Sequence, residues 1–298
     1  MANDKPLAGR IALVTGATRG IGKGIAVELA VNGAKVYFTG RSTVEDPMRP
    51  GTVARTEQEI GEAGGEAVGL RCDHHDDEQV AAVFDRIRSE DGRLDLLVNN
   101  ATAEMSSMVG KKFWELPLDI WDDVIGVGLR SHYVASWHAV PLMLGQKDAL
   151  IVNVSSHGSR EYLMGVSYGV GKAGVEKLTS DMAKELEEHD VAVTSIWPGL
   201  CKSENRLVLA ETQPDGRVTL FGLDLTYAET PHFPGRAVVA LASDPEPMKK
   251  TGRAFWVADL AREYGFTDVD GSIPDAEKLH EQLKTGDAPE FWREVLGV

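Results

Sequence analysis

The sequence predicts a doubly wound α/β fold, in which one mostly parallel sheet of seven strands lies between two layers of helices. Short apolar runs rich in Val, Ile and Leu recur along the chain, and longer amphipathic segments separate them. Runs that are apolar throughout are typical of strands buried on both faces, as in parallel sheets. Their alternation with helical segments favours a single domain over residues 1–298, although this length would also accommodate two domains.

The predicted strands and helices follow one another in a regular order. The strands are RIALVT (10–15), AKVYFTG (34–40), EAVGLRC (66–72), LDLLVN (94–99), ALIVNVS (149–155), VAVTSIW (191–197) and a weaker GRAFWVA (252–258). Helical periodicity is seen in GIGKGIAVELAVNG (20–33), DDEQVAAVFDRIRSE (76–90) and GVEKLTSDMAKELEEH (174–189). Long helices are expected over 117–144 and 166–189.

Two segments interrupt this alternation, residues 101–119 and residues 201–231. Both follow the C-terminal ends of predicted strands, the edge at which open α/β sheets bind ligands. Long loops in compact domains are usually functional, so we expect substrate-side loops and short helices in both segments. The alternative is that they are tolerated insertions.

Composition limits the classes of function. The formal net charge of −15 argues against nucleic-acid binding, which needs a basic face, although a local basic pocket can still hold an anionic cofactor. The two cysteines, Cys72 and Cys201, are far apart in the sequence, which favours a reducing compartment without a disulfide. The first ten residues lack the apolar core of a signal peptide, and no apolar run is long enough to span a bilayer. We therefore expect a cytoplasmic protein.

A glycine-rich turn, TGATRGIG (Thr15–Gly22), lies between the first predicted strand and the first predicted helix. Glycine allows the backbone to turn sharply and approach a pyrophosphate, and a helix N-terminus offers free N–H groups with a favourable dipole. The glycines do not have the usual GxGxxG spacing. The prediction of a dinucleotide site therefore depends on the position of the turn between a strand and a helix. The alternative is a turn needed only for close packing. The expected cofactor contacts are Gly16, Thr18, Arg19, Gly20, Ile21 and Gly22.

The end of the second predicted strand indicates which dinucleotide binds. NAD sites usually have an acidic residue there, whereas this strand ends in Gly40 and Arg41. Together with Arg19 in the glycine turn, Arg41 favours a 2′-phosphate and hence NADP(H), because arginine holds phosphate oxygens bidentately. NAD(H) remains the alternative, with both arginines as solvated surface charges.

The segment after the third predicted strand, RCDHHDD, contributes a further candidate. Asp73 is placed to accept a hydrogen bond from the adenine amine. His74 and His75 are expected to be exposed loop residues, and no metal site is predicted because a recognisable set of ligands is absent.

Candidate catalytic residues follow the fifth predicted strand. Ser155 and Ser156 end that strand, and Tyr168 and Lys172 are one helical turn apart on one face of the next helix. A free tyrosine has a pKa of about 10, which a neighbouring ammonium and the positive nicotinamide ring of an oxidised cofactor would lower. Tyr168 would then protonate an alkoxide, or take the proton back in reverse, while a serine hydroxyl stabilises the charge on the carbonyl oxygen. Lys172 is also placed to bind ribose hydroxyls of the cofactor.

Taken together, these motifs resemble the short-chain dehydrogenase/reductase superfamily over nearly the whole chain. The turn matches TGxxxGxG, Asn99-Asn100-Ala101 matches the NNA motif, and Ser156, Tyr168 and Lys172 match the Ser…YxxxK set. A narrower likeness to one subgroup rests on residues 111–133, 167–174, 196–200 and 258–271. The resemblance implies a Rossmann-like fold, carbonyl–alcohol chemistry and a homodimer or homotetramer. It also implies cofactor contacts from Asn99, Ala101, Tyr168, Lys172, Pro198, Gly199 and Ser203.

Two departures from the family pattern affect the expected chemistry. Gly128 stands where the family usually has an Asn that anchors a proton-relaying water, so the relay must use backbone, water or another residue, or be weaker. Ser156 lies twelve residues before Tyr168, whereas thirteen is commoner and Ser155 satisfies it. Strand alternation sends the two serines to opposite sides, and we prefer Ser156 because the strand end fixes position better than loop length.

The leading hypothesis is an NADP(H)-dependent carbonyl reductase or alcohol dehydrogenase, and the alternative is a catalytically silent dinucleotide-binding protein. A Ser–His hydrolase is disfavoured, because the GxSxG elbow is missing. The substrate is expected to be a fairly hydrophobic ketone or aldehyde. Its pocket would be lined by Met105, Met108, Phe113, Trp114, Leu163, Met164, Leu207, Leu209, Phe221 and Leu223, several of which could equally be core.

Overall fold

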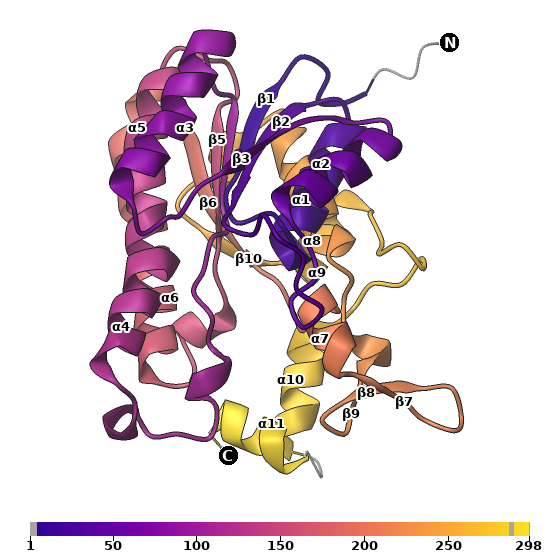
Figure 1. Ribbon diagram of the computed structural model, residues 1–298. Helices are drawn as coiled ribbons and strands as arrows, with labels where there is room; N and C mark the ends of the chain where they lie inside the picture. The colour runs from indigo at the N-terminus through magenta and orange to yellow at the C-terminus, as the bar shows by residue number, and fades with distance from the viewer. Residues whose placement is uncertain (1–4, 286–288, 298) are drawn as a thin grey trace.

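Seven parallel strands form one sheet in the order β10-β6-β5-β4-β1-β2-β3 (Figure 1). The computed structural model describes residues 5–285 and 289–297, so the predicted domain ends and part of the N-terminal segment lie outside the described residues. The strands are β1 (Ile11–Val14), β2 (Lys35–Gly40), β3 (Glu66–Arg71), β4 (Leu96–Asn99), β5 (Leu150–Val154), β6 (Ala192–Trp197) and β10 (Ala254–Trp256). The predicted fold class is confirmed, with a Rossmann-like sheet whose order reverses between β1 and β4.

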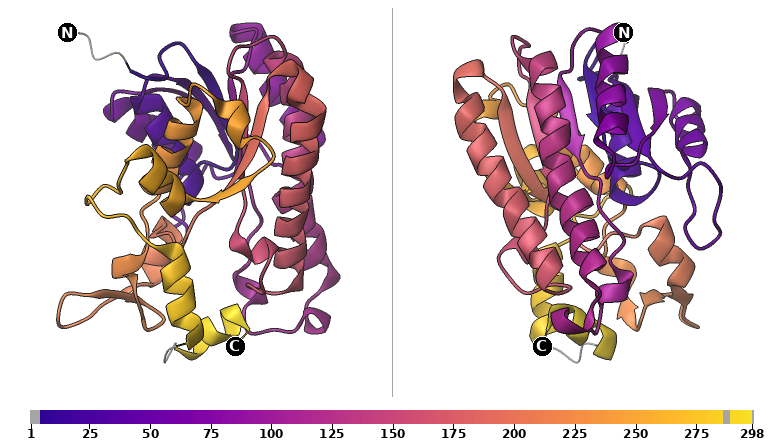
Figure 2. Two further views of the ribbon diagram at one scale, coloured as in Figure 1. Left: turned by 180° about the vertical axis from the view of Figure 1, so that it is seen from behind. Right: turned by 60° about the vertical axis from the view of Figure 1, so that its left-hand side comes forward.

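Helices cover both faces of the sheet (Figures 1 and 2). On one face lie α1 (Gly20–Val31), α2 (Val53–Glu62), α8 (His232–Ala242) and α9 (Val257–Tyr264). On the other lie α3 (Asp77–Glu90), α5 (Ser131–Met143) and α6 (Val166–Leu186). Among the described residues, no helix is both long enough and apolar enough to cross a bilayer.

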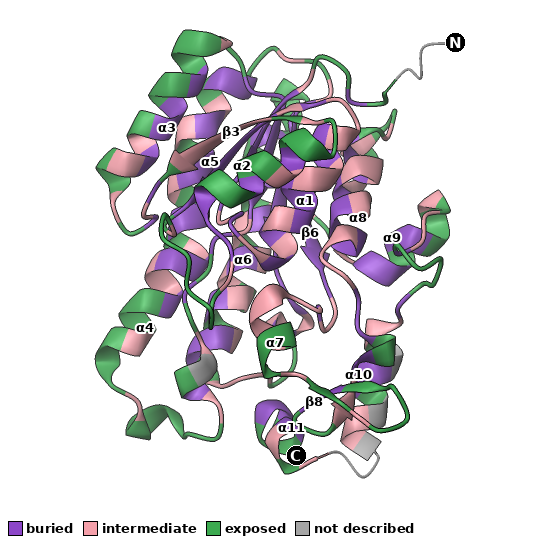
Figure 3. Ribbon diagram, turned by 45° about the vertical axis from the view of Figure 1, so that its right-hand side comes forward, coloured by how far each residue is buried: buried purple, intermediate pink, exposed green. Residues whose placement is uncertain are grey.

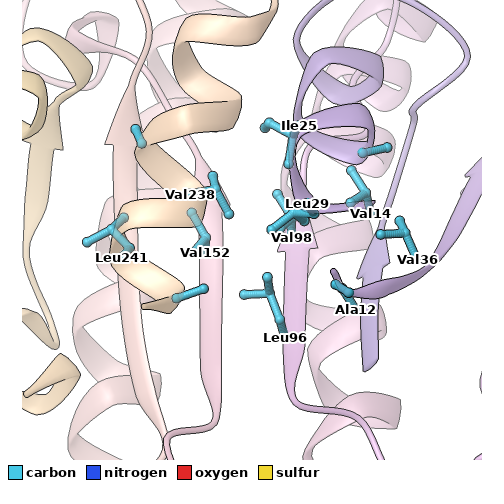
Figure 4. Close-up of a cluster of buried hydrophobic side chains, with 14 of the residues drawn as sticks. Ala12, Val14, Ile25, Leu29, Val36, Leu96, Val98, Val152, Val238 and Leu241 are labelled. Atoms are coloured by element: carbon cyan, nitrogen blue, oxygen red, sulfur yellow. The ribbon is translucent and has the colours of Figure 1, made fainter. Parts of the chain in front are cut away.

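The two faces of β1 show why its run is apolar throughout. Ala12 and Val14 pack with Ile25 of α1 in one core cluster, whereas Leu13 packs with Phe84 of α3 in the other. Figure 4 shows the first cluster, with side chains from α1 and α8 meeting the sheet. Each fully buried side chain of this size contributes roughly 1.5–3 kcal/mol, so alternating polar residues would be costly on either face.

The seventh predicted strand was too long. Strand β10 ends at Trp256, and Val257 already begins α9. Helix α9 has Asp259 in its first turn and ends at Gly265 with a φ of 75°, a left-handed conformation that glycine adopts without strain. Because of these helix signals, residues 257 and 258 belong to α9 and not to the strand that the apolar run GRAFWVA predicted.

The long helix predicted over 117–144 is divided. It consists of α4 (Leu118–Ile125), a π-helical turn (Gly126–Arg130) and α5. The glycines at 126 and 128 weaken the regular α-helix here, because glycine costs about 1 kcal/mol relative to alanine in a helix interior.

Both interrupting segments lie at the C-terminal edge of the sheet. Residues 101–117 form a loop with two short 3₁₀ turns. The second segment holds α7 (Glu204–Leu209) and a small antiparallel sheet of β7 (Glu211–Thr212), β8 (Val218–Leu220) and β9 (Leu223–Asp224). Helices α10 (Ala276–Thr285) and α11 (Glu290–Leu296) reach the same region, as Figures 1 and 3 show.

Candidate active site

The glycine turn joins β1 to α1 and packs against the loop after β4. Gly16 has a φ of 68°, and a Cβ there would lie 2.8 Å from Ala101 Cα, so only glycine fits. The Asn100 side-chain amide donates to the carbonyl oxygens of Thr15 and Gly16, both at 2.9 Å. The structure thus brings two predicted cofactor contacts, Gly16 and Ala101, into direct contact.

The N-terminus of α1 is open to an anion. Its N-cap residue, Arg19, makes no side-chain capping bond, and the first turn of the helix contains no acidic residue. The Gly20 N–H instead donates at 2.7 Å to Oε2 of Glu204, a residue from α7. Oε1 of Glu204 lies 2.6 Å from Lys23 Nζ. A carboxylate from a distant segment thus takes the position at which a helix N-terminus holds a phosphate, so the residues present fit a dinucleotide pyrophosphate.

Ser203 lies opposite this helix start. A Cβ at Gly20 would be 3.3 Å from Ser203 Cβ, so the two predicted cofactor residues face each other across a short gap. Thr18 is buried, and a Cβ at Gly40 would lie 2.2 Å from its Cγ2. The turn is therefore held against the end of β2. Ile21 and Gly22 follow within the first turn of α1.

Arginine side chains gather at the end of β2. Arg19 Nη2 donates to Ser42 Oγ at 2.7 Å and to the carbonyl oxygens of Arg49 and Gly51. Arg41 is exposed and pairs with Asp73 at 3.8 Å. Arg19 therefore reaches Ser42, the residue after Arg41, while Arg41 itself pairs with Asp73; their contacts with a cofactor stay predictions. Ser42 and Arg49 also belong to this group, and sequence analysis missed both.

The expectation that His74 is an exposed loop residue is wrong. Its side chain is buried, and its Nε2 lies 2.8 Å from Thr39 Oγ1. Burial lowers the pKa of His74 to about 4, so the ring is neutral. His75 is exposed, as expected, and its Nε2 lies 3.1 Å from Asp123 Oδ1. No three metal-ligating side chains within the described ranges are grouped to hold a metal ion.

The Asn99 side chain lies in the core, and its expected contact with the cofactor stays a prediction. Its side chain is fully buried and donates to Ser136 Oγ at 3.0 Å and Asn153 Oδ1 at 2.9 Å, and Asn153 in turn donates to Thr179. This polar chain crosses the core from α5 to α6. The side chain therefore faces the helix layer rather than the glycine turn, because alternation along β4 directs it inward.

The predicted catalytic residues lie together after β5. The Ser156 hydroxyl lies close enough to the Tyr168 phenol to act on its pKa, and its oxygen accepts the Gly158 N–H at 3.1 Å. Ser155 instead donates to the carbonyl oxygen of Lys172 at 3.5 Å, on the α6 backbone side. The strand end thus separates the two hydroxyls, and Ser156 is the one that faces the phenol. A Cβ at Gly158 would lie 2.8 Å from the Tyr168 ring, so this loop position needs glycine.

Lys172 lies one turn beyond Tyr168 and is partly buried. Its Nζ is 5.8 Å from the centre of the Tyr168 ring and donates to the Val154 carbonyl oxygen at 2.9 Å. Burial lowers the pKa of Lys172 to about 8, against an opposing effect of Glu176. An ammonium and a phenol are thus brought together on one face of α6.

Lys172 does not lower the pKa of Tyr168 in the protein without cofactor, and the effect of a bound nicotinamide ring stays a prediction. Burial raises the pKa of Tyr168, and the nearby Ser156 hydroxyl and the charge of Arg206 only partly oppose this. Desolvation disfavours the phenolate more than the polar neighbours favour it. The phenol is therefore protonated at neutral pH.

Comparison with known proteins agrees with this geometry. A family model for short chain dehydrogenases matches residues 10–214. The chain belongs to the short-chain dehydrogenase/reductase family, a family of oxidoreductases.

Three members of the family are particularly informative. The chain is 42% identical over 273 residues to human dehydrogenase/reductase SDR family member 1, covering 89% of this chain and 85% of that protein. It is 32% identical over 252 residues to the 3-oxoacyl-(acyl-carrier-protein) reductase FabG of Vibrio harveyi, covering 84% and 96%. The crystal structure of a metagenomic short-chain oxidoreductase in complex with NADP has a TM-score of 0.64 and 30% identity, covering 81% and 94%.

Pro198 and Gly199, two of the residues expected to contact the cofactor, directly follow β6, and a buried acid lies next to Gly199. Glu229 accepts a hydrogen bond from the Gly199 N–H, while its other oxygen, Oε1, is buried without a partner. Burial raises the pKa of Glu229 to about 8, so the carboxyl is mostly protonated at neutral pH. Pro198 is buried beside it, and a Cβ at Gly199 would lie 2.6 Å from Ala276 at the start of α10. No local pattern in the sequence marks Glu229, because its contact with Gly199 forms only when the chain returns to the C-terminal edge of the sheet.

Apolar side chains surround Tyr168 on the substrate side. Of the predicted pocket residues, Met105, Met108, Leu163 and Met164 pack in one cluster with Tyr168. Leu223 lies in the neighbouring cluster, in which Leu163 and Met164 also take part. The other five predicted residues are largely exposed, namely Phe113, Trp114, Leu207, Leu209 and Phe221. Phe113 and Trp114 contact each other edge to face, so the predicted aromatic wall is at the surface.

The C-terminal helices complete this side of the site. The Met164 N–H donates to the Val295 carbonyl oxygen at 2.8 Å, and Trp292 is buried in the cluster with Leu163 and Met164. Helix α10 is also tied to the loop after β5 by polar side chains. His157 Nε2 lies 3.2 Å from His280 Nδ1, and His280 Nε2 lies 2.9 Å from Glu161 Oε2. Sequence analysis did not place α10 or α11 at the site, because no local motif marks them.

Proposed function

We propose that the chain is an NADP(H)-dependent oxidoreductase that interconverts a ketone or aldehyde and the corresponding alcohol, with Tyr168 as general acid and base. The observation that carries this proposal is the grouping of Ser156, Tyr168 and Lys172 at the sheet edge that also holds the glycine turn. The name of the Vibrio harveyi relative, a reductase of a 3-oxo group, supports a carbonyl substrate.

The cofactor would be held along this edge. The N-terminus of α1 and Ser203 suit the pyrophosphate, and Lys172 suits the ribose hydroxyls. Arg19, which donates to Ser42 Oγ, and Arg41, which precedes Ser42 in the sequence, suit a 2′-phosphate, since guanidinium groups bind phosphate oxygens with charge-assisted hydrogen bonds. The NADP complex of the metagenomic relative supports this preference over NAD(H). When bound, the nicotinamide supplies or accepts the hydride.

The chain's own groups handle the proton. Tyr168 is protonated at neutral pH, as an acid for carbonyl reduction must be. Ser156 accepts the Gly158 N–H through Oγ, and its hydroxyl hydrogen remains available to stabilise negative charge on the substrate oxygen. Lys172 holds positive charge near the phenol, which favours its return to phenolate when the alcohol is oxidised.

The test is turnover of a panel of apolar ketones and aldehydes with NADPH. We expect oxidation of NADPH by the wild type and a loss of at least about a hundredfold in kcat for Tyr168→Phe, which keeps the ring but removes the transferable proton. Equal rates for the two proteins would contradict the mechanism. Tight cofactor binding without turnover of any substrate would support the alternative, a silent binding protein.

An apolar face on α4 and α5 supports assembly with a second copy of the chain. Leu118, Trp121, Tyr133 and Trp137 are exposed on these helices, and Val170 is exposed on α6. We propose that this face is buried in a homodimer or homotetramer, which sedimentation of the wild type and Trp137→Glu would test. A reducing, cytoplasmic location is also proposed, because Cys72 and Cys201 are both free and buried.

A further inference from the structure

The backbone at Gly128 lies close to the proposed catalytic residues and has space beside it. Gly128 is buried in the π-helical turn between α4 and α5. A Cβ at position 128 would lie 3.7 Å from Thr102 Oγ1, which is an ordinary contact distance. Apart from the helix backbone and the two adjacent residues, Thr102 Oγ1 is the nearest atom to that position. π-Helical turns inside α-helices are frequent at functional sites.

His132 lies one turn further along the same helix. Its side chain is 1% exposed, and its Nε2 is 3.2 Å from the Ala101 carbonyl oxygen. A carbonyl can only accept, so Nε2 carries the hydrogen and Nδ1 has a free lone pair. Nδ1 is buried and has no hydrogen-bond partner. An unpartnered buried acceptor is costly, so this atom is expected to bind a donor.

The groups that face His132 show which donor suits it. Lys172 from α6 lies near enough for its charge to act on the ring, as does His74 from the loop after β3. Burial, with the charge of Lys172, lowers the pKa of His132 to about 3, so the ring stays a neutral acceptor. The ammonium of Lys172 has three hydrogens, and the bond to Val154 uses one of them. A neutral acceptor beside a partly buried ammonium is electrostatically favourable.

We propose that Nδ1 of His132 holds the ammonium of Lys172 through one hydrogen-bonded water beside Gly128, which makes His132 a positioning residue for Tyr168 and Lys172. Thr102 Oγ1 offers the water a third partner, and buried waters typically make about three hydrogen bonds. His132 neither gains nor loses a proton in this role. The consequence for turnover rests on the proposed function, whereas the contact itself does not.

The first test uses the wild type in the absence of cofactor. Nitrogen NMR of the histidine rings should show His132 as the neutral tautomer with hydrogen on Nε2 and a hydrogen-bonded Nδ1. A protonated Nδ1 would overturn the inference. This measurement requires neither turnover nor a stable variant.

The second test follows the titration of Lys172 by NMR in three variants. His132→Leu removes the acceptor, so the pKa of Lys172 should fall from about 8 by roughly half a pH unit. Adding Gly128→Asn to this variant supplies an amide oxygen and should restore the value. His138→Leu, a histidine on the same helix that stacks on Phe84, should leave it unchanged. An unchanged Lys172 titration in His132→Leu would refute the proposal.

Kinetics then separate the two proposals. If the wild type reduces carbonyls, His132→Leu should lower kcat by roughly tenfold or more with KM nearly unchanged, and Gly128→Asn should recover part of the loss. A wild type without turnover would contradict the proposed function. The Lys172 titration would still decide the role of His132.

Discussion

Removing the charge of Glu204 should strengthen cofactor binding. Its Oε2 accepts the Gly20 N–H at 2.7 Å, and its Oε1 lies 2.6 Å from Lys23. A phosphate bound at the start of α1 must displace this carboxylate or lie next to it. In either case the negative charge opposes binding, and Glu204→Gln removes that charge while keeping the size of the side chain.

The size of the effect follows from the contacts. A hydrogen bond to a charged group contributes roughly 1.5–3 kcal/mol. The side chains of Glu204 and Lys23 are 23% and 18% exposed, so solvent screens part of this interaction. We therefore expect about 1–2 kcal/mol, which corresponds to a roughly five- to thirtyfold lower Kd for NADPH.

Titration of NADPH by calorimetry would measure this change. Glu211→Gln, an exposed carboxylate on nearby β7, is the matched control and should bind like the wild type. Added salt should narrow the difference between Glu204→Gln and the wild type. Without cofactor, Glu204→Gln should unfold at a lower temperature, because the ion pair with Lys23 is lost and the hydrogen bond from the Gly20 N–H is no longer charge-assisted. Equal or weaker binding of NADPH by Glu204→Gln would refute the reasoning.

Three further outcomes are expected. Ser156→Ala should lower kcat by roughly a hundredfold, whereas Ser155→Ala should leave it nearly unchanged, and the reverse pattern in steady-state rates would make Ser155 the catalytic serine. Replacing Arg41 by Ala should raise the KM for NADPH about tenfold with little effect on NADH, and equal effects on both cofactors would argue against a 2′-phosphate contact. The raised pKa of Glu229 means that the wild type loses stability as pH rises from about 4.5 to about 8, because only the unfolded state ionises there. Glu229→Gln should therefore gain up to a few kcal/mol over the wild type across that range, and thermal unfolding curves that coincide at pH 5 and pH 8 would contradict this.

Local patterns in the sequence predict most of the fold. A strand buried on both faces must be apolar at every position, so β1, β5 and β6 can be recognised from their own residues. The same is true of the contact between Tyr168 and Lys172, since helical spacing alone puts them on one face. Features of this kind depend on a few neighbouring residues.

Features that depend on distant segments could not be predicted in this way. The contact between Gly20 and Glu204 joins residues 184 positions apart, and nothing around either residue marks it. His74 was expected in solvent because its neighbours are polar, yet the end of β2 covers it. The direction of the Tyr168 pKa shift also depends on burial, which the tyrosine–lysine spacing does not reveal.

The hydrogen bond between Met164 and Val295 affects how the site is assembled during synthesis. Met164 has a φ of 60°, an unusual conformation for a residue other than glycine, and α11 fastens it in place. The sheet, the glycine turn and Tyr168 are all encoded before residue 260. The wall beside Tyr168 nevertheless remains incomplete until residues 290–297 have left the ribosome, so a nascent chain can acquire its sheet well before it can enclose a substrate.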